Sequence, residues 1–112
     1  MLVNNASSFY PTPAGTITEA QWDDLVGTNL KAPLFLSQAA LPGLRDAGGV
    51  IVNIIDVHSS HPLRDHPVYG PAKAGLAMLT RSLAKDLAPD VRVNGVSPGA
   101  ILWPEGDMSE ET

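Results

Sequence analysis

The sequence contains no cysteine, so disulfides and thiolate metal sites are excluded. Its 7 Lys and Arg residues form no cluster, and the net charge of −5 argues against binding to nucleic acid. No segment has the length and apolarity of a membrane span, and the N-terminus lacks the basic and apolar pattern of a signal peptide. These absences predict a soluble, cytoplasmic protein.

The length and composition fit one small domain. The chain has 112 residues, 44% of them hydrophobic, and it contains no internal repeat. Residues 104–112 are acidic, and we expect this tail to be poorly ordered.

Three short apolar segments have the pattern of β-strands. Residues 50–55 are apolar at every position except Asn53, which is typical of a strand buried on both faces of a parallel sheet. For Asn53 itself we expect a satisfied core amide or a polar residue at the strand end. Residues 1–5 and 91–96 are predicted to form the other two strands.

Helical patterns separate these strands. Thr18 and Gln21 have capping-box spacing, which predicts a helix that starts there and buries Trp22. A second helical stretch is predicted from Asn29 to about Arg45, and a third from residues 68–71 to about residue 87.

The alternation of strands and helices predicts an α/β fold. Right-handed crossovers would build a three-stranded parallel sheet with the helices mainly on one face. The other face has no helix in this sequence to cover it. Sites in such sheets lie beyond the carboxyl ends of the strands, so the loops after all three strands should converge on one rim.

Tyr69 and Lys73 are the main candidate catalytic residues. They lie four residues apart, so they share one face of the third helix, and Asp56 ends the second strand thirteen residues before Tyr69. A nearby ammonium should lower the pKa of the phenol and suit it to proton transfer near neutral pH. Chance often produces this spacing, however. Asp56 could instead cap the following turn, and Asn29 could be an ordinary helix N-cap.

Several motifs occur in an order that resembles a known family. Asn4-Asn5-Ala6-Ser7, Asn29, Asp56, Tyr69-x-x-x-Lys73 and Pro98-Gly99 are similar to the C-terminal catalytic part of a short-chain dehydrogenase/reductase. The resemblance covers most of residues 1 to about 103 and implies that residues 1–112 form a single partial, Rossmann-like, doubly wound NAD(P)-binding domain. Ser7 replaces the family's usual glycine and Asp56 its usual serine, and both departures resemble the pteridine reductase branch.

That branch implies a reaction, a cofactor and a set of site residues. The reaction would transfer hydride from NADPH, with NADH not excluded, to a C=N bond of a pterin or dihydrofolate. The catalytic residues by this resemblance are Tyr69, Lys73, Asp56 and Asn29. The substrate-binding residues by this resemblance are Ser7, Phe9, Asp56 and Tyr69. The cofactor-binding residues by this resemblance are Asn4, Asn5, Ala6, Ser7, Tyr69, Lys73, Pro98, Gly99, Ala100 and Ile101.

The three histidines, His58, His61 and His66, share one loop. Their spacing could hold a metal, but no acidic or histidine partner in helical register supports one, so we predict no metal site. We expect these side chains to line the mouth of the substrate pocket or the surface.

The Gly-rich turn that binds a dinucleotide diphosphate is absent from the sequence. We therefore expect a fragment of a longer reductase or a degenerate short form, which alone would bind NADPH weakly. Two alternative functions stay open. One is a generic short-chain reductase of ketones or imines. The other is a truncated, non-catalytic protein that associates, as a homo-oligomer, through the helices at 29–45 and 69–87.

Overall fold

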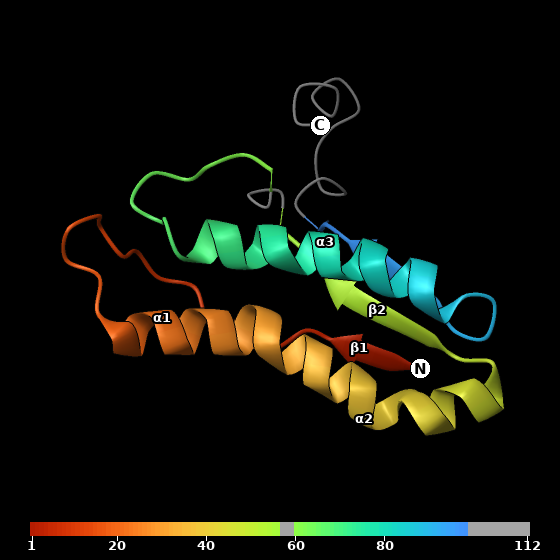
Figure 1. Cartoon of the computed structure of the whole chain (residues 1–112). Coiled ribbons are helices and arrows are strands. Elements are labelled where there is room, and N and C mark those ends of the chain that lie inside the picture. The colour runs from red at the N-terminus through yellow and green to blue at the C-terminus, as the bar shows by residue number, and fades with distance from the viewer. Residues whose placement is uncertain (57–59, 99–112) are drawn as a thin grey trace, which may run out of the picture.

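The computed structural model describes residues 1–56 and 60–98 (Figure 1). The predictions for His58, Gly99, Ala100, Ile101 and the tail at 104–112 lie outside these residues. Within them, the strands β1 (Leu2–Asn4), β2 (Val50–Ile54) and β3 (Arg92–Val96) form one parallel sheet in the order β1-β2-β3. The predicted three-stranded parallel α/β fold is confirmed.

The helices lie together on one side of this sheet (Figure 1). They are α1 (Glu19–Val26), the π-helical segment η1 (Gly27–Lys31), α2 (Ala32–Ala47) and α3 (Tyr69–Leu87). None of the helices within residues 1–56 and 60–98 is long and apolar enough to cross a membrane.

The first helical region is continuous, whereas the sequence predicted two separate helices. It starts at the predicted capping box, where the backbone N–H of Gln21 donates to Thr18 Oγ1 over 3.1 Å and that of Thr18 donates to Gln21 Oε1 over 2.9 Å. Pro33 has no N–H to donate to the carbonyl of Asn29, four residues earlier, and the helix widens into a π-turn there. Asn29 therefore lies inside a helix, and its interpretation as an N-cap is wrong.

Two glycines allow the turn that ends α2 and the close packing of α3 against η1. Gly48 ends α2 with a φ of 61°, a left-handed conformation that glycine adopts without strain. Gly75 of α3 faces Leu30 of η1, and a Cβ at this position would lie 2.9 Å from Leu30 Cδ2. The missing side chain therefore lets α3 approach η1 closely.

The core lies between the sheet and the helices. One cluster of buried side chains contains Leu44, Ile51, Val91 and Val93. A second cluster, nearer the carboxyl ends of the strands, contains Leu25, Val68 and Tyr69. Burying an apolar side chain of this size contributes about 1.5–3 kcal/mol to stability.

Two predictions about burial need correction. Ile51 and Asn53 of β2 are fully buried, but Val52 and the other residues of its second face are only half-buried, because no described helix covers that face. Trp22 was expected in the core but is 51% exposed, because the buried position of α1 is taken by Leu25. Asn53 is a satisfied core amide, since it accepts from Asn4 Nδ2 over 2.8 Å and donates to Thr80 Oγ1 over 3.0 Å.

Candidate active site

The predicted catalytic side chains meet at the carboxyl end of β2. Asp56 follows this strand, Tyr69 is the first residue of α3, and Lys73 lies one turn further along the helix. The Tyr69 hydroxyl donates to Asp56 Oδ2 over 2.6 Å. The Lys73 ammonium donates to the backbone carbonyl of Ile54 over 3.0 Å. The geometry therefore joins the phenol to the carboxylate, with the ammonium fixed at the end of the strand.

A cavity of about 290 Å³ opens beside these groups. The residues that line it come from the ends of all three strands and from the start of α3; they are Asn5, Ser7, Ile54, Ile55, Asp56, Tyr69, Lys73 and Pro98. The predicted convergence on one rim of the sheet is thus present. The Tyr69 hydroxyl and the Lys73 ammonium, which are hydrogen-bond donors, and the Asp56 carboxylate, which is an acceptor, thus lie around one small cavity.

The pKa of Tyr69 is raised above its ordinary value, so the predicted lowering by Lys73 is wrong. Burial of the phenol is the largest cause, followed by its hydrogen bond to Asp56 and the negative charge of that carboxylate; a hydrogen bond with Ser7 acts in the opposite direction. The pKa of Lys73 is lowered, because burial of the ammonium outweighs the opposing effect of the negative charge on Asp56. The phenol is therefore protonated at neutral pH, as a proton donor must be.

Asn29 is fully buried and organises the loop after β1. Its Nδ2 donates to the carbonyls of Ser8 and Leu25, each over 2.9 Å, and its Oδ1 accepts from Ser7 Oγ over 2.9 Å. The side chain thus holds Ser7 at the edge of the cavity. Its suggested direct part in catalysis stays a prediction.

Phe9 lies beside the Tyr69 phenol and against His66, a residue that the sequence did not identify as part of the site. Its ring is stacked on His66 with centroids 4.9 Å apart and meets Tyr69 edge-on at 4.8 Å. The sequence placed His66 only at a pocket mouth or on the surface. Its position three residues before Tyr69, in the segment that leads into the same helix, is the signal that could have identified it.

The cofactor-binding residues predicted after β1 separate into two groups. Asn5 and Ser7 line the cavity. The amide of Asn4 instead donates to Asn53 and, over 3.4 Å, to Ser37 in the core, and Ala6 borders a smaller hollow near α2. The contacts of these residues with a cofactor stay predictions.

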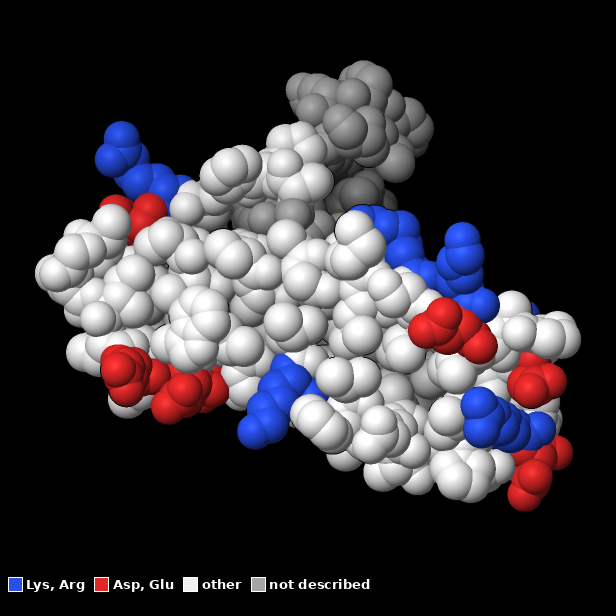
Figure 2. Space-filling model, in the orientation of Figure 1, with Lys and Arg blue, Asp and Glu red and all other residues white. Residues whose placement is uncertain are grey.

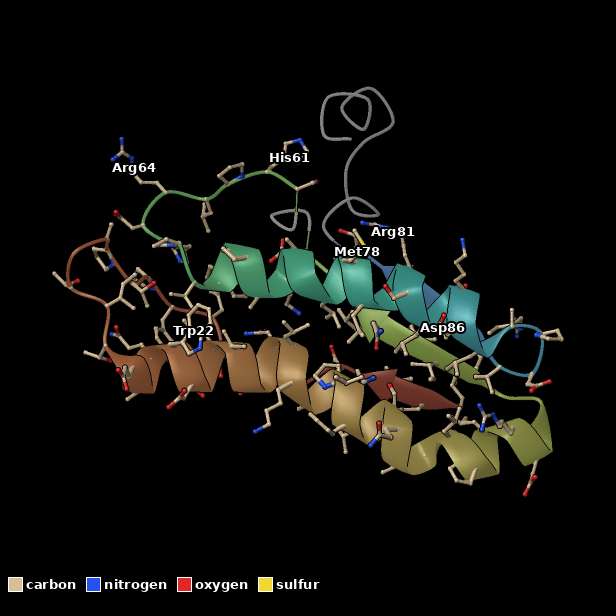
Figure 3. All side chains as sticks on the ribbon, viewed as in Figure 1. Trp22, His61, Arg64, Met78, Arg81 and Asp86 are labelled. Carbon is tan, nitrogen blue, oxygen red and sulfur yellow. The ribbon has the colours of Figure 1, made fainter. Side chains whose placement is uncertain are left out.

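Metal-ligating side chains do not gather anywhere in the described ranges. Within residues 1–56 and 60–98, no group of three histidine or acidic side chains is placed to hold a metal ion. Figure 3 shows His61 and Arg64 on the loop before α3, with their side chains directed away from the helices.

Comparison with known proteins assigns the family. Residues 1–111 match the family model described as short chain dehydrogenase. The chain belongs to this family. The enzymes of the short-chain family are oxidoreductases that bind NAD(P) and act on small molecules.

Relatives of known name differ in substrate. The chain is 41% identical to Pteridine reductase 1 of Leishmania tarentolae, over 94% of this chain and 44% of that protein. It is 38% identical to D-xylose 1-dehydrogenase of Caulobacter vibrioides, over 90% of this chain and 42% of that protein. The structure of acetoin dehydrogenase YohF from Salmonella typhimurium superposes with a TM-score of 0.81 at 30% identity, covering 86% of this chain and 39% of that one. The chain spans less than half the length of these relatives.

Proposed function

We propose that the protein carrying this chain reduces a C=N bond of a pterin or dihydrofolate, with NADPH as the expected hydride donor. The observation that carries the proposal is the 2.6 Å hydrogen bond from Tyr69 to Asp56 at the carboxyl end of β2. It places a protonated phenol and a carboxylate on one small cavity.

This pair suits a nitrogen heterocycle. Hydride addition to the carbon of a C=N bond builds negative charge on the nitrogen, and a proton from the Tyr69 hydroxyl neutralises it. Asp56 can accept hydrogen bonds from amino and ring N–H groups, which a serine at this position would do less well. A carboxyl group and a phenol in direct contact titrate as a coupled pair, so Asp56 also helps to return a proton to Tyr69.

The residues of the cavity fit the nicotinamide end of the cofactor. Lys73, Tyr69 and Ser7 offer an ammonium and two hydroxyls around one edge of the cavity, a donor set that suits ribose hydroxyls. When bound, the dihydronicotinamide would supply the hydride. Lys73 would hold the ribose, and Phe9 would face a flat substrate from the side of the loop.

A second candidate is a dehydrogenase of sugars or simple carbonyl compounds. The identity of 38% to D-xylose 1-dehydrogenase is close to that of the pteridine reductase. A Tyr and Lys pair also suits proton transfer to or from an alcohol oxygen. Asp56 is the feature that favours the pterin, because an alcohol offers no amino group to a carboxylate.

The test is a substrate screen with the protein that carries this chain. Oxidation of NADPH and of NADH is followed with dihydrobiopterin, dihydrofolate and a simple ketone, and reduction of NADP⁺ and NAD⁺ is followed with D-xylose. We expect the highest kcat/KM with a dihydropterin and NADPH. Turnover of xylose or the ketone without turnover of the pterins would contradict the proposal and support the second candidate.

We also propose that copies of the protein associate through α2 and α3. Phe35, Leu36 and Met78 on these helices are each more than half exposed. Figure 2 shows the charged side chains of this side of the molecule mostly toward its ends and edges. Ala74→Trp should disrupt the assembly in light-scattering measurements, whereas Tyr69→Phe should leave it unchanged. Equal masses for wild type and Ala74→Trp would contradict this interface.

A further inference from the structure

The ring of Phe9 is not held in place by burial. This side chain is 56% exposed, yet it lies against both His66 and the catalytic Tyr69. An exposed aromatic side chain on a loop can adopt several rotamers unless its neighbours restrict it. The position of Phe9 therefore depends on the contacts that fix the backbone on either side of it.

The two residues that flank Phe9 are bound to one carboxylate on α1. Tyr10 Oη donates to Asp24 Oδ2 over 2.7 Å, and Ser8 Oγ donates to Asp24 Oδ1 over 3.4 Å. Both oxygens of Asp24 are therefore engaged, one on each side of Phe9. Both bonds are made to a carboxylate, and the one from the Tyr10 phenol is the stronger because it is shorter.

The loop is also held at its start by η1. Asn29 accepts from Ser7 Oγ and donates to the carbonyl of Ser8, each over 2.9 Å. Asn29 lies on the buried side of the helical region, whereas Asp24 is exposed. Asn29 thus binds the loop on the buried side of the helical region, and Asp24 binds it on the exposed side.

Opposite Asp24, Phe9 meets the segment that leads into α3. The rings of Phe9 and His66 are nearly parallel, at 17°, while Phe9 and Tyr69 are close to perpendicular, at 78°. The loop after β1 and the segment before α3 are also joined by a hydrogen bond, in which the backbone N–H of Thr12 donates to the carbonyl of Asp65 over 2.8 Å. Phe9 therefore bridges the loop after β1 and the beginning of the catalytic helix.

We propose that Asp24 is a positioning residue, which holds Phe9 beside Tyr69 by binding Ser8 and Tyr10 and so sets the affinity for a flat substrate that it does not touch. That Phe9 contacts the substrate rests on the proposed function. That Asp24 holds Phe9 rests only on the contacts above. The hydrogen bond to Asp24 also raises the pKa of Tyr10, which keeps this phenol a donor.

The first experiment follows the ring protons of His66 by NMR in the ligand-free protein that carries this chain, with labelled histidine. The His66 signals are assigned by their loss in His66→Asn. Phe9 should displace these signals through its ring current. Asp24→Ala and Tyr10→Phe should each remove most of this displacement, and Asp24→Asn, which keeps one acceptor oxygen, should remove less. Alanine at an exposed helical position favours the helix, so α1 should remain folded.

Asp23→Ala is the matched control, because Asp23 is the exposed neighbour of Asp24 on the same helix. It removes the same charge and should leave the His66 signals in place. Unchanged His66 signals in Asp24→Ala and Tyr10→Phe would overturn the proposal. So would an equal change in Asp23→Ala, which would indicate a general effect of charge.

The second experiment measures turnover of a dihydropterin. Asp24→Ala should raise KM about three- to tenfold with kcat changed less than about twofold, as expected for loss of a surface hydrogen bond that acts on binding alone. The double variant Asp24→Ala/Tyr10→Phe should be no worse than the more affected single variant. Additive losses, or a fall in kcat alone, would contradict the role. If no dihydropterin is turned over, the proposed function fails, while the NMR result still decides whether Asp24 holds Phe9.

Discussion

The two faces of the sheet differ in what covers them. On the helical face, Ile51 is fully buried and its neighbour Val93 is 7% exposed. On the other face, Val3 is 48% exposed and Val52, paired with it, is only half-buried. The same strands therefore contribute a packed core on one side and an apolar surface on the other.

This difference separates two parts of the chain. The proposed proton-transfer groups belong to the packed side, because Asp56 follows the end of β2 and Tyr69 starts α3. Their geometry needs only the described strands and helices. The opposite face offers apolar side chains without described partners, and a large exposed apolar surface is typical of a surface that packs against something else. The geometry of Asp56 and Tyr69 thus does not depend on a cover over the second face of the sheet.

The largest expected effect comes from removing the proton donor. Tyr69→Phe keeps the ring and its contacts with Phe9 but removes the hydroxyl that donates to Asp56. We expect kcat of the protein carrying this chain to fall about 10²- to 10⁴-fold, the usual contribution of a general acid. Steady-state kinetics with the best substrate of the screen measures it.

Tyr10→Phe is the control for this variant, because it removes the other phenol hydroxyl of the chain. It should leave kcat almost unchanged. A Tyr69→Phe protein with more than about a tenth of the wild-type kcat would show that another group supplies the proton.

The two faces should differ clearly in stability. Val93→Ala removes two methyl groups from the packed face and should lower the free energy of unfolding by about 2 kcal/mol, because it leaves a cavity beside Ile51. Val52→Ala removes the same atoms from the uncovered face and should cost less than about 1 kcal/mol. Urea denaturation of both variants measures the difference. Equal losses would mean that the second face is packed in solution.

A smaller effect is expected in the alkaline titration of Tyr69. Its raised pKa means that the folded state binds this proton more tightly than the unfolded state, so the stabilisation is present below a pH of about 10 and is lost as the pH rises further. The difference in phenolate absorbance between wild type and Tyr69→Phe should appear above that pH. Asp56→Asn should shift the transition downward, because it removes the negative charge. Ionisation of Tyr69 near neutral pH would contradict the geometry.

The sequence predicted the features that depend on local pattern. The capping box at Thr18 and Gln21, the three strands and the start of α3 follow from spacing and turn residues alone. The convergence of Asn5, Asp56 and Pro98 followed from the rule that loops meet at the carboxyl ends of parallel strands. The pairing of Asp56 with Tyr69 was implied by the family resemblance.

Contacts between distant segments could not be predicted in this way. The exposure of Trp22 depends on which side of α1 meets the core. The pKa of Tyr69 depends on how deeply the ring is buried and on which charged group its hydroxyl contacts. The binding of Ser8 and Tyr10 to Asp24 likewise requires the loop to fold back on α1, which no local spacing encodes.

We propose that Asp56, together with Tyr69, suits this site to a nitrogen heterocycle. The most direct measurement compares wild type and Asp56→Ser, in the protein carrying this chain, with a dihydropterin and a simple ketone. We predict that kcat/KM for the pterin falls about 10²-fold or more, while that for the ketone stays within a few fold. A proportional fall with both substrates, or an unchanged rate with the pterin, would contradict this role of Asp56.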